Sequence, residues 1–304
     1  MSKSARVRAQ NARERIAAQQ AATRRAEFRR RAMFAGGSVV AVLAVVIAVI
    51  LYAANKNSPP AAGNNGTSGT VLPASVSSDV TGVPAGTEYS VGAGSVGTWL
   101  TNDEGGAPPL LRVSNSRLIS DGKPEMLYIG AEFCPFCAAM RWSMAVALSR
   151  FGHFSTALRG FHSSPSDSYP NTPTLTFYKA GYTSKYLTFT PVENEDINRN
   201  VLQATTSAQM ALWEKYDSSS DGVSYPFIDF GNKVVLKTPI VDPSILAGKS
   251  WAEVAAALHE PTSPIGQAEL GAANYVTAAI CTMTGNAPAS VCSASTIQTM
   301  EKGI

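Results

Sequence analysis

The longest apolar segment of the chain lies near its N-terminus, between Met33 and Ala54, where no charged residue occurs. As a helix, these 22 residues would rise ~33 Å at about 1.5 Å per residue, enough to cross a hydrocarbon core of about 30 Å. A cleaved secretory signal has a shorter apolar region of about 7–15 residues. The pattern therefore predicts an uncleaved transmembrane helix over 33–54, in preference to a cleaved signal or a buried core helix.

The apolar and polar pattern after residue 108 predicts a folded domain. A short apolar run, Met126–Ala131, is typical of a strand buried on both faces. Apolar residues then recur at helical spacing, which predicts a helix that begins at Pro135 and stops near Gly152. The residues of this stripe are Phe136, Met140, Met144, Leu148 and Phe151.

Further elements follow by the same periodicities. The predicted strands are Thr156–His162, a hairpin of Thr174–Tyr178 with Lys185–Thr190, and two strands within Ser224–Leu236 around Gly231-Asn232. The predicted helices are Glu195–Tyr216, Trp251–Leu258 and Ile265–Ile280. This mixture indicates an α/β or α+β domain of about 200 residues over 109–304. Residues 55–108, rich in Gly, Ser and Pro, are predicted to be a linker that adds no core.

Charge sets the expected orientation of the membrane segment. Residues 1–32 hold ten Lys/Arg and two Glu, whereas the rest of the chain holds 15 basic and 20 acidic residues, so the net charge of +3 hides an asymmetry. Because positive flanks stay in the cytoplasm, we expect a single-pass protein of the cell membrane with an extracytoplasmic C-terminal domain. The tail is expected to be solvated and to set topology, with a helix on the anionic inner leaflet as the alternative. Its lack of interleaved aromatic residues indicates no nucleic-acid partner.

Cys134 and Cys137 form a C-P-F-C sequence at the predicted start of the helix. The helix N-terminus stabilises a thiolate by typically about 0.3–1 kcal/mol, so Cys134 is the candidate nucleophile. Cys137 lies one turn further in and is the candidate resolving thiol. In an oxidising compartment such a pair can exchange with other disulfides.

Two other interpretations of the pair stay open. A zinc site needs two further ligands, and neither a second C-x-x-C nor a suitable spacing of His153 and His162 provides them, so we expect no metal and no cofactor. A soft metal ion could use Met140 as a third ligand, although Met140 fits the apolar core face better. A local structural disulfide is the third possibility, and it would add little stability because its loop is short.

These residues carry a resemblance. The segment G-A-E-F-C-P-F-C, between a strand and a helix, resembles the thioredoxin superfamily site, and S-Y-P-F-I-D-F-G-N-K is similar to the later segment of that superfamily in which a cis-proline opens a strand. Residues 110–280, including S-S-P-S-D-S-Y-P-N-T-P-T and Asp242–Trp251, resemble membrane-anchored, thioredoxin-like proteins of unassigned function in actinobacteria. A helical insertion over 194–217 resembles the DsbA-like plan.

The resemblance implies roles for individual residues. Pro226 would be cis, in preference to Pro173, and Tyr225 would offer its backbone to an extended substrate. Pro135 and Phe136 would line the same substrate groove. Tyr128 stands where thioredoxin has a buried Asp. This departure favours an oxidase or isomerase over a reductase.

The remaining acidic and cysteine residues near these motifs have simpler expectations. Glu132 is expected to be solvated at the end of its strand. Cys281 and Cys292 are expected to form a structural disulfide, in preference to an electron-shuttle pair.

The favoured function is therefore a thiol–disulfide oxidoreductase. Its expected partners are secreted or envelope protein thiols and disulfides, a membrane redox partner, and lipid through 33–54. A non-enzymatic binding module of the cell envelope is the main alternative, and a soft-metal chaperone is another. The direction of electron flow, the substrate and the oligomeric state stay open.

Overall fold

The computed structural model describes residues 69–96, 110–217 and 222–304. The basic tail over 1–32, the predicted transmembrane helix over 33–54 and much of the predicted linker lie outside these residues. Within the described ranges, no helix is both long and apolar enough to cross a bilayer.

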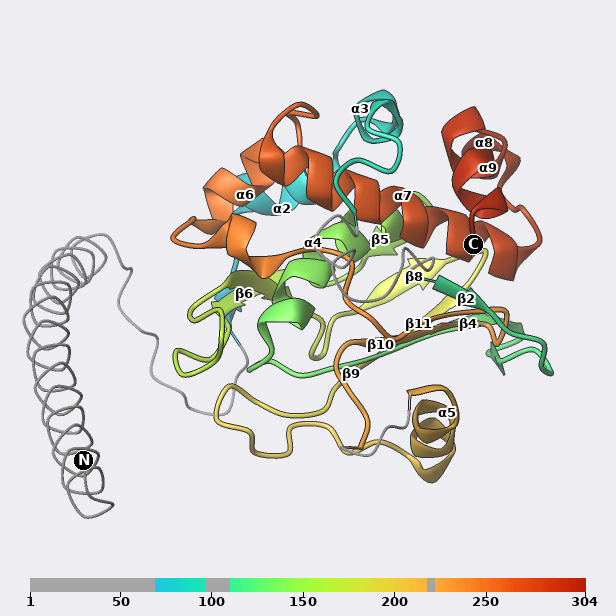
Figure 1. Cartoon of the computed structure of the whole chain (residues 1–304), viewed down its shortest axis with the longest axis horizontal. Coiled ribbons are helices and arrows are strands. Elements are labelled where there is room, and N and C mark those ends of the chain that lie inside the picture. Colours follow the sequence, from blue (N-terminus) through green and yellow to red (C-terminus); the bar gives the residue numbers. More distant parts are fainter. Residues whose placement is uncertain (1–68, 97–109, 218–221) are drawn as a thin grey trace, which may run out of the picture. The chain divides into compact units, whose positions relative to one another are not determined.

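Within the described residues, a mixed sheet of six strands lies at the centre of an α/β fold (Figure 1). Its strands are β2 (Leu110–Arg112), β3 (Ile119–Ser120), β4 (Lys123–Gly130), β9 (Thr188–Glu193), β10 (Phe227–Phe230) and β11 (Val234–Leu236). Strand β4 is central, because it pairs in parallel with β9 and in antiparallel orientation with β10. Beyond β10 the sheet continues through β11 to β2. The β3–β4 hairpin turns at Asp121 and Gly122, whose φ angles are 50° and 72°.

Strand β4 is buried on both faces over its second half, as its apolar sequence predicts. Successive side chains of a strand point to opposite faces. Met126 and Tyr128 accordingly belong to the larger hydrophobic core, whereas Leu127 and Ile129 belong to a second cluster with Trp213. The mixed α/β class is therefore built with a hydrophobic layer on each face of the sheet.

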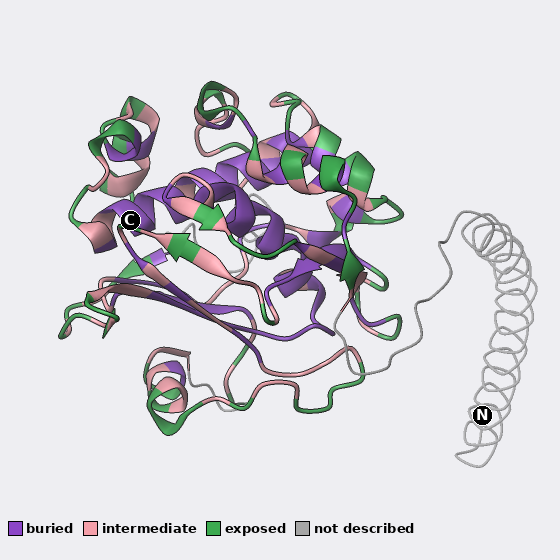
Figure 2. Cartoon of the chain, turned by 180° about the vertical axis from the view of Figure 1, so that it is seen from behind, coloured by how far each residue is buried: buried purple, intermediate pink, exposed green. Residues whose placement is uncertain are grey.

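Helices cover both layers. They are α2 (Ala74–Thr81), α3 (Ala85–Ser90), α4 (Pro135–Leu148), α5 (Ser207–Asp217), α6 (Trp251–Ala257), α7 (Pro264–Thr284), α8 (Ala289–Cys292) and α9 (Ser295–Lys302), with a 3₁₀ turn η1 (Pro243–Leu246). Helices α4 and α7 pack together on one face, and α5 lies on the opposite face (Figure 1). Figure 2 shows α4 almost wholly buried and α5 largely exposed on its outer side.

Several predicted elements are confirmed. Helix α6 and helix α7 match the predicted helices, with α7 extended at its C-terminal end to Gly285 in the left-handed conformation. Strands β10 and β11 match the predicted pair around Gly231-Asn232. The β4–turn–α4 succession has the predicted order, with Pro135 in the first helical turn.

The predicted hairpin of Thr174–Tyr178 with Lys185–Thr190 is wrong. Strand β7 (Pro173–Thr176) pairs with β6 (Arg159–His162), and β6 also pairs with β1 (Thr70–Val71). The second segment enters β9 instead, and the chain between them forms β8 (Tyr182–Ser184), which pairs with β5 (Gly152–Phe154). Alternation of apolar residues indicates the buried face of a strand but not its partner.

The prediction of a linker without core residues is wrong for the part of 55–108 that the structure describes. Residues 70–90 form β1, α2 and α3. Leu72, Val76 and Val80 are buried in the main core, and α2 contacts α6 and α4. These three apolar residues among many Ser, Thr and Gly dock the segment, because they recur at helical spacing.

The predicted long helix over Glu195–Tyr216 is also wrong in its first half. Helix α5 begins only at Ser207, still within the predicted insertion between β9 and β10. The Asp196 carboxylate accepts hydrogen bonds from the backbone N–H groups of Asn198 and Asn200 at 2.8 and 2.9 Å. Such local side-chain bonds compete with helix formation.

The predicted Cys281–Cys292 disulfide is confirmed, with a Cα–Cα distance of 5.6 Å. It links the last turn of α7 to α8. A crosslink that closes a loop of about this length stabilises a fold by on the order of 2–3 kcal/mol.

We expect the Cys281→Ala/Cys292→Ala double variant to lose about 2–3 kcal/mol in the free energy of unfolding, measured by urea denaturation. A near-ultraviolet circular dichroism spectrum equal to that of the wild type would show that the fold itself is kept. A loss below about 0.5 kcal/mol would contradict the stabilising role.

A buried carboxyl lies between α4 and α7. Glu269 is fully buried and accepts a hydrogen bond from the Ser143 hydroxyl. Burial raises the pKa of the Glu269 carboxyl from 4.5 to about 8. The proton therefore binds more tightly to the folded than to the unfolded chain, and the folded state gains stability below the unfolded-state pKa.

The free energy of unfolding should therefore fall as the pH rises from about 4.5 to about 8, at roughly 1.4 kcal/mol per pH unit at most. Urea unfolding of wild type and Glu269→Gln across this range measures the effect. We expect the variant to lose most of this slope, because its amide cannot ionise. An unchanged slope would mean that Glu269 titrates near its ordinary value.

Candidate functional site

The C-P-F-C turn lies between β4 and α4 (Figure 1). Strand β4 ends at Gly130, and Cys134 is the N-cap residue of α4. The backbone N–H of Cys137 donates to Cys134 Sγ at 3.4 Å, so the thiol takes the place of the usual capping hydroxyl. Both cysteines are free thiols and both are buried. The geometry that the sequence predicted for the pair is present.

The loop before β10 meets this turn. The Tyr225–Pro226 peptide bond is cis, whereas Pro173 begins β7 and is not among the described cis prolines, so the prediction in favour of Pro226 is confirmed. Cys134 Sγ lies 4.0 Å from the carbonyl oxygen of Tyr225. Antiparallel pairing of Phe227 with Ile129 aligns the start of β10 with the end of β4, which brings the loop to the cysteines.

The two thiols differ in acidity. A hydrogen bond from the Cys137 thiol lowers the pKa of Cys134, against the opposing effect of burial, with help from backbone N–H groups and from the Arg141 charge. Burial raises the pKa of Cys137 well above its ordinary value, and its bond to Cys134 raises it further. Cys134 is therefore the thiol that ionises first, which supports its assignment as nucleophile.

Phe133, Phe136 and Tyr225 pack in one cluster with Cys134, and together with Tyr169, which contacts Phe136, they form an aromatic cover. Phe133 contacts Tyr225 edge-to-face at 5.8 Å between ring centroids, and Phe136 contacts Tyr169 at 5.6 Å. Only 5% of the Cys134 surface is exposed. The thiol is therefore reached by a partner only where this cover gives way.

The Arg199 guanidinium lies on the outside of the cover. Its carbon is 3.7 Å from the centroid of the Phe133 ring, and it forms an ion pair of 3.2 Å with Asp167. This contact joins the turn after β9 to the loop after β6, on either side of the C-P-F-C turn. Because the Arg199 side chain is 60% exposed, the pair itself adds little stability.

The predicted groove residues divide into two pairs. Tyr225 and Phe136 are half-buried and belong to the aromatic cover, whereas Pro135 and Pro226 are buried beneath it. The Tyr225 hydroxyl donates to Glu195 at 3.0 Å and accepts from the Asn194 amide at 2.7 Å. These bonds, with the ring of Trp213 at 5.0 Å, hold Tyr225 beside the cysteines.

The expectation that Glu132 is solvated is wrong. Glu132 is 3% exposed and its carboxylate accepts a hydrogen bond of 2.8 Å from the Thr176 hydroxyl. Strand β7 lies over this turn, and the sequence-based pairing of strands missed that neighbour. Glu132 therefore belongs to the buried support of the site.

Tyr128 fills the space beside the end of β4. It is fully buried, and its hydroxyl has no hydrogen-bond partner among the described residues. A Cβ atom added to Gly130 would lie within 2.0 Å of this hydroxyl, so the phenol lies along the strand toward the cysteine turn. Burial raises the pKa of Tyr128 well above its ordinary value, and it stays neutral.

Sequence reasoning missed a buried ion pair beneath the cysteines. Arg141 and Glu193 are both fully buried, and Arg141 Nη2 lies 2.6 Å from Glu193 Oε2. The signal was present, since Arg141 is the single charged residue in an otherwise apolar helix and follows Cys137 by four residues. Charged residues are rarely fully buried unless they are paired.

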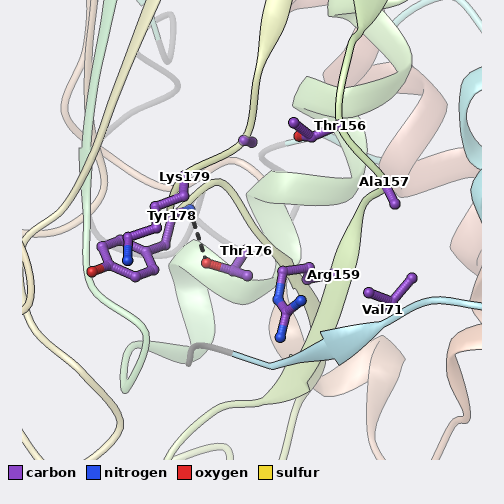
Figure 3. A pocket seen from close by; sticks show the side chains of 8 residues that line it. Val71, Thr156, Ala157, Arg159, Thr176, Tyr178 and Lys179 are labelled. Carbon is purple, nitrogen blue, oxygen red and sulfur yellow. Dashed lines mark hydrogen bonds between the residues drawn. The ribbon is translucent and has the colours of Figure 1, made fainter. Parts of the chain in front are cut away.

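A pocket of about 320 Å³ lies beside β1, β6 and β7, and neither cysteine of the C-P-F-C turn lines it (Figure 3). Arg159 and Lys179 line it together with Thr176, whose side-chain oxygen accepts the Tyr178 backbone N–H. Arg159 is engaged with the carbonyl oxygen of Gly69 at 2.6 Å. The pocket touches the site only indirectly, through the bond from Thr176 to Glu132.

Among the described residues, no three or more His, Cys, Asp or Glu side chains gather closely enough to hold a metal ion. Met140 packs in the main core, whereas Cys134 and Cys137 form a separate small cluster with Ala131 and Phe133. Met140 therefore packs in a different cluster from the two thiols, which it would have to join in a soft-metal site.

Residues 109–282 match a family described as a domain of unknown function (DUF929). The chain belongs to this family. The matched region includes both cysteines of the C-P-F-C turn, the ion pair and the cis-proline loop, and it ends one residue after Cys281. No curated protein and no solved structure matches the chain significantly.

Removal of the Arg199 side chain should expose Cys134. We expect Arg199→Ala to raise the rate of iodoacetamide alkylation of the reduced protein several-fold, because Phe133 then loses its outer contact. Mass spectrometry would assign the label to Cys134.

Lys249→Ala is the matched control. It removes an exposed ion pair in which Lys249 Nζ lies 3.8 Å from Glu253 Oε1, at the start of α6. Its alkylation rate should equal that of the wild type. Equal rates in all three proteins would show that Arg199 does not restrict access.

Proposed function

We propose that this chain is a membrane-anchored, extracytoplasmic thiol–disulfide oxidoreductase with a thioredoxin-like fold. One observation carries the proposal: the free Cys134 thiol caps α4, faces the cis-proline loop and has a lowered pKa. The thiolate is the reactive form of cysteine, and this environment favours it.

The strand order supports the thioredoxin-like part of the proposal. Strand β4 is followed by α4 and pairs in parallel with the later strand β9. The antiparallel pair β10–β11 comes next, and then α7, which lies on the same face as α4. The sheet order β9–β4–β10–β11 with the cysteines after the central strand resembles the arrangement of that superfamily. Helix α5 occupies the place of the DsbA-like insertion, although it is shorter than expected.

The chemistry follows from the order of acidity. The Cys134 thiolate attacks one sulfur of a substrate disulfide, and the other sulfur leaves with the bonding electron pair and takes a proton. Cys137, as thiolate, then attacks Cys134 Sγ, which closes the Cys134–Cys137 disulfide and releases the second substrate thiol. The substrate gains two electrons and the protein loses them, and the reverse sequence oxidises a dithiol.

We favour oxidation or isomerisation over reduction. Tyr128 stays neutral through burial, so no carboxylate at that position takes the Cys137 proton. The expected partners are secreted or envelope protein thiols and disulfides, together with a membrane redox protein that restores the pair. The basic residues before the apolar segment over 33–54 support an extracytoplasmic site.

The low solvent exposure of Cys134 favours a second candidate function. A thiol that is 5% exposed also fits a non-enzymatic binding module of the envelope whose Cys134–Cys137 bridge is hard to reduce. The two functions differ in one respect, which is whether Cys134 forms bonds with other proteins.

Trapping of mixed disulfides in cells tests the proposal. We expect Cys137→Ser to accumulate disulfide-linked complexes with envelope proteins on non-reducing gels, because no resolving thiol remains. Cys134→Ser is the matched control and should accumulate none. A wild-type protein that shows no exchange in a glutathione redox titration, with no complexes from either variant, would support the binding module instead.

The same titration gives the direction of electron flow. A midpoint reduction potential of about −120 mV would fit an oxidase, and one of about −270 mV would fit a reductase. Because Tyr128 stays neutral and cannot take the Cys137 proton, we expect a value toward the oxidising end.

A further inference from the structure

Arg141 joins four parts of the fold beneath the cysteine turn. Its Nε and Nη2 lie 2.9 and 2.6 Å from the two carboxylate oxygens of Glu193, at the end of β9. Nη2 also donates to the carbonyl oxygen of Ala131 at 2.9 Å, and Nη1 lies 3.4 Å from the Thr174 hydroxyl. Hydrogen bonds from Nε, Nη1 and Nη2 therefore fix the orientation of the guanidinium.

Arg141 also lies close to the cysteine turn. Arg141 follows Cys137 by one helical turn and shares its face of α4. The residue that it bonds, Ala131, packs in one cluster with Cys134 and Cys137. Glu193 pairs in register with Gly130 and also accepts the Phe177 backbone N–H at 3.1 Å, so its carboxylate is fixed at the end of β9.

Apart from Arg199, which lies outside the aromatic cover and pairs with Asp167, the other ionisable groups near the thiols do not supply a positive charge. Tyr128 on β4 and Tyr225 before β10 are the neighbouring phenols, and Glu132 and Glu195 are bonded to Thr176 and to Tyr225. Among the described residues, Arg141 is the cation whose charge acts on both Cys134 and Cys137.

We propose that Arg141, held by Glu193, is a positioning residue that stabilises the Cys137 thiolate in the resolving step. This inference rests on the proposed exchange. In that step the Cys137 thiol loses its proton, and the thiolate attacks Cys134 Sγ. The bond between Cys134 Sγ and the substrate sulfur breaks, and its electron pair and a proton go to the leaving thiol. A fixed cation beneath Cys137 offsets the burial that otherwise opposes its ionisation.

The chain contains a matched control for a buried ion pair. Arg150 Nε lies 2.5 Å from Glu88 Oε2, and the Glu88 side chain is fully buried. This pair joins the region after α4 to α3, and its charges are not among those that act on the cysteines. Loss of either pair removes an arginine and a fully buried carboxylate, but only the loss of Arg141–Glu193 should change the thiols.

The test measures thiol ionisation in the full-length protein in detergent micelles, with ¹³Cβ-labelled cysteine followed by NMR across pH. We expect Arg141→Met/Glu193→Met to raise the midpoints of Cys134 and Cys137 by about one pH unit or more. Glu193→Gln should lower them, because it removes the counter-ion and keeps the cation. Arg141→Lys should keep them within about 0.3 units of wild type. Arg150→Met/Glu88→Met should leave them unchanged.

The exchange reaction supplies the second readout. At neutral pH the release of glutathione from its mixed disulfide with Cys134 should slow roughly three- to fourfold per unit rise in the Cys137 pKa, since a lower thiolate fraction is partly offset by higher nucleophilicity. Stopped-flow mixing of the reduced protein with oxidised glutathione measures this rate.

The outcomes separate the two proposals. A wild type that does not exchange overturns the proposed function, and the NMR midpoints still decide on Arg141. Thiol midpoints that do not move in the Met/Met variant, or that move in the same direction in Glu193→Gln, overturn the role of Arg141. If the Met/Met variant does not fold, Glu193→Gln decides, because midpoints that do not fall in this variant overturn the role of Arg141.

Discussion

The bidentate pairing of Arg141 with Glu193 is the interaction on which the candidate site depends. It ties α4 to the end of β9, and through Ala131 and Thr174 it ties both to the end of β4 and to β7. Two fully desolvated ions cost several kcal/mol each before they attract one another, and apolar residues of similar size often serve a core equally well. The pair therefore adds little stability. It instead fixes how α4, β4, β7 and β9 are oriented around Arg141, because each of its bonds has a defined direction.

The cysteine pair combines an ionisable sulfur with a closed surface. Capping of α4 by Cys134 and the field of Arg141 favour the thiolate, while the aromatic cover keeps all but 5% of Cys134 from solvent. A buried thiolate without these partners would be too costly to form. The rings around it are held from outside by Arg199 and from below by the bonds of Tyr225. Access and reactivity are thus set by different residues.

Local signals predicted the elements well wherever one segment determines its own structure. The apolar run of β4, the stripe of α4 and the Gly231-Asn232 turn carry their conformation within a few residues, and the structure has them as predicted. The cis bond at Pro226 and the Cys281–Cys292 disulfide also matched expectation.

The errors concern partners at long range. Strand β7 was assigned the wrong neighbour, Glu132 was expected in solvent because β7 was not placed over it, and Leu72, Val76 and Val80 were read as linker residues. The Arg141–Glu193 contact spans 52 residues and depends on parallel pairing of β4 with β9, which the sequence pattern does not specify.

The close approach of Tyr128 to Gly130 has a consequence for how this sequence can vary. Any side chain at residue 130 would occupy the space of the phenol hydroxyl, because a single Cβ atom already overlaps it. A smaller residue at 128 would conversely leave a void beneath the cysteine turn that Gly130 cannot fill. The two positions are therefore sterically coupled, because only a smaller side chain at residue 128 would leave room for a side chain at residue 130.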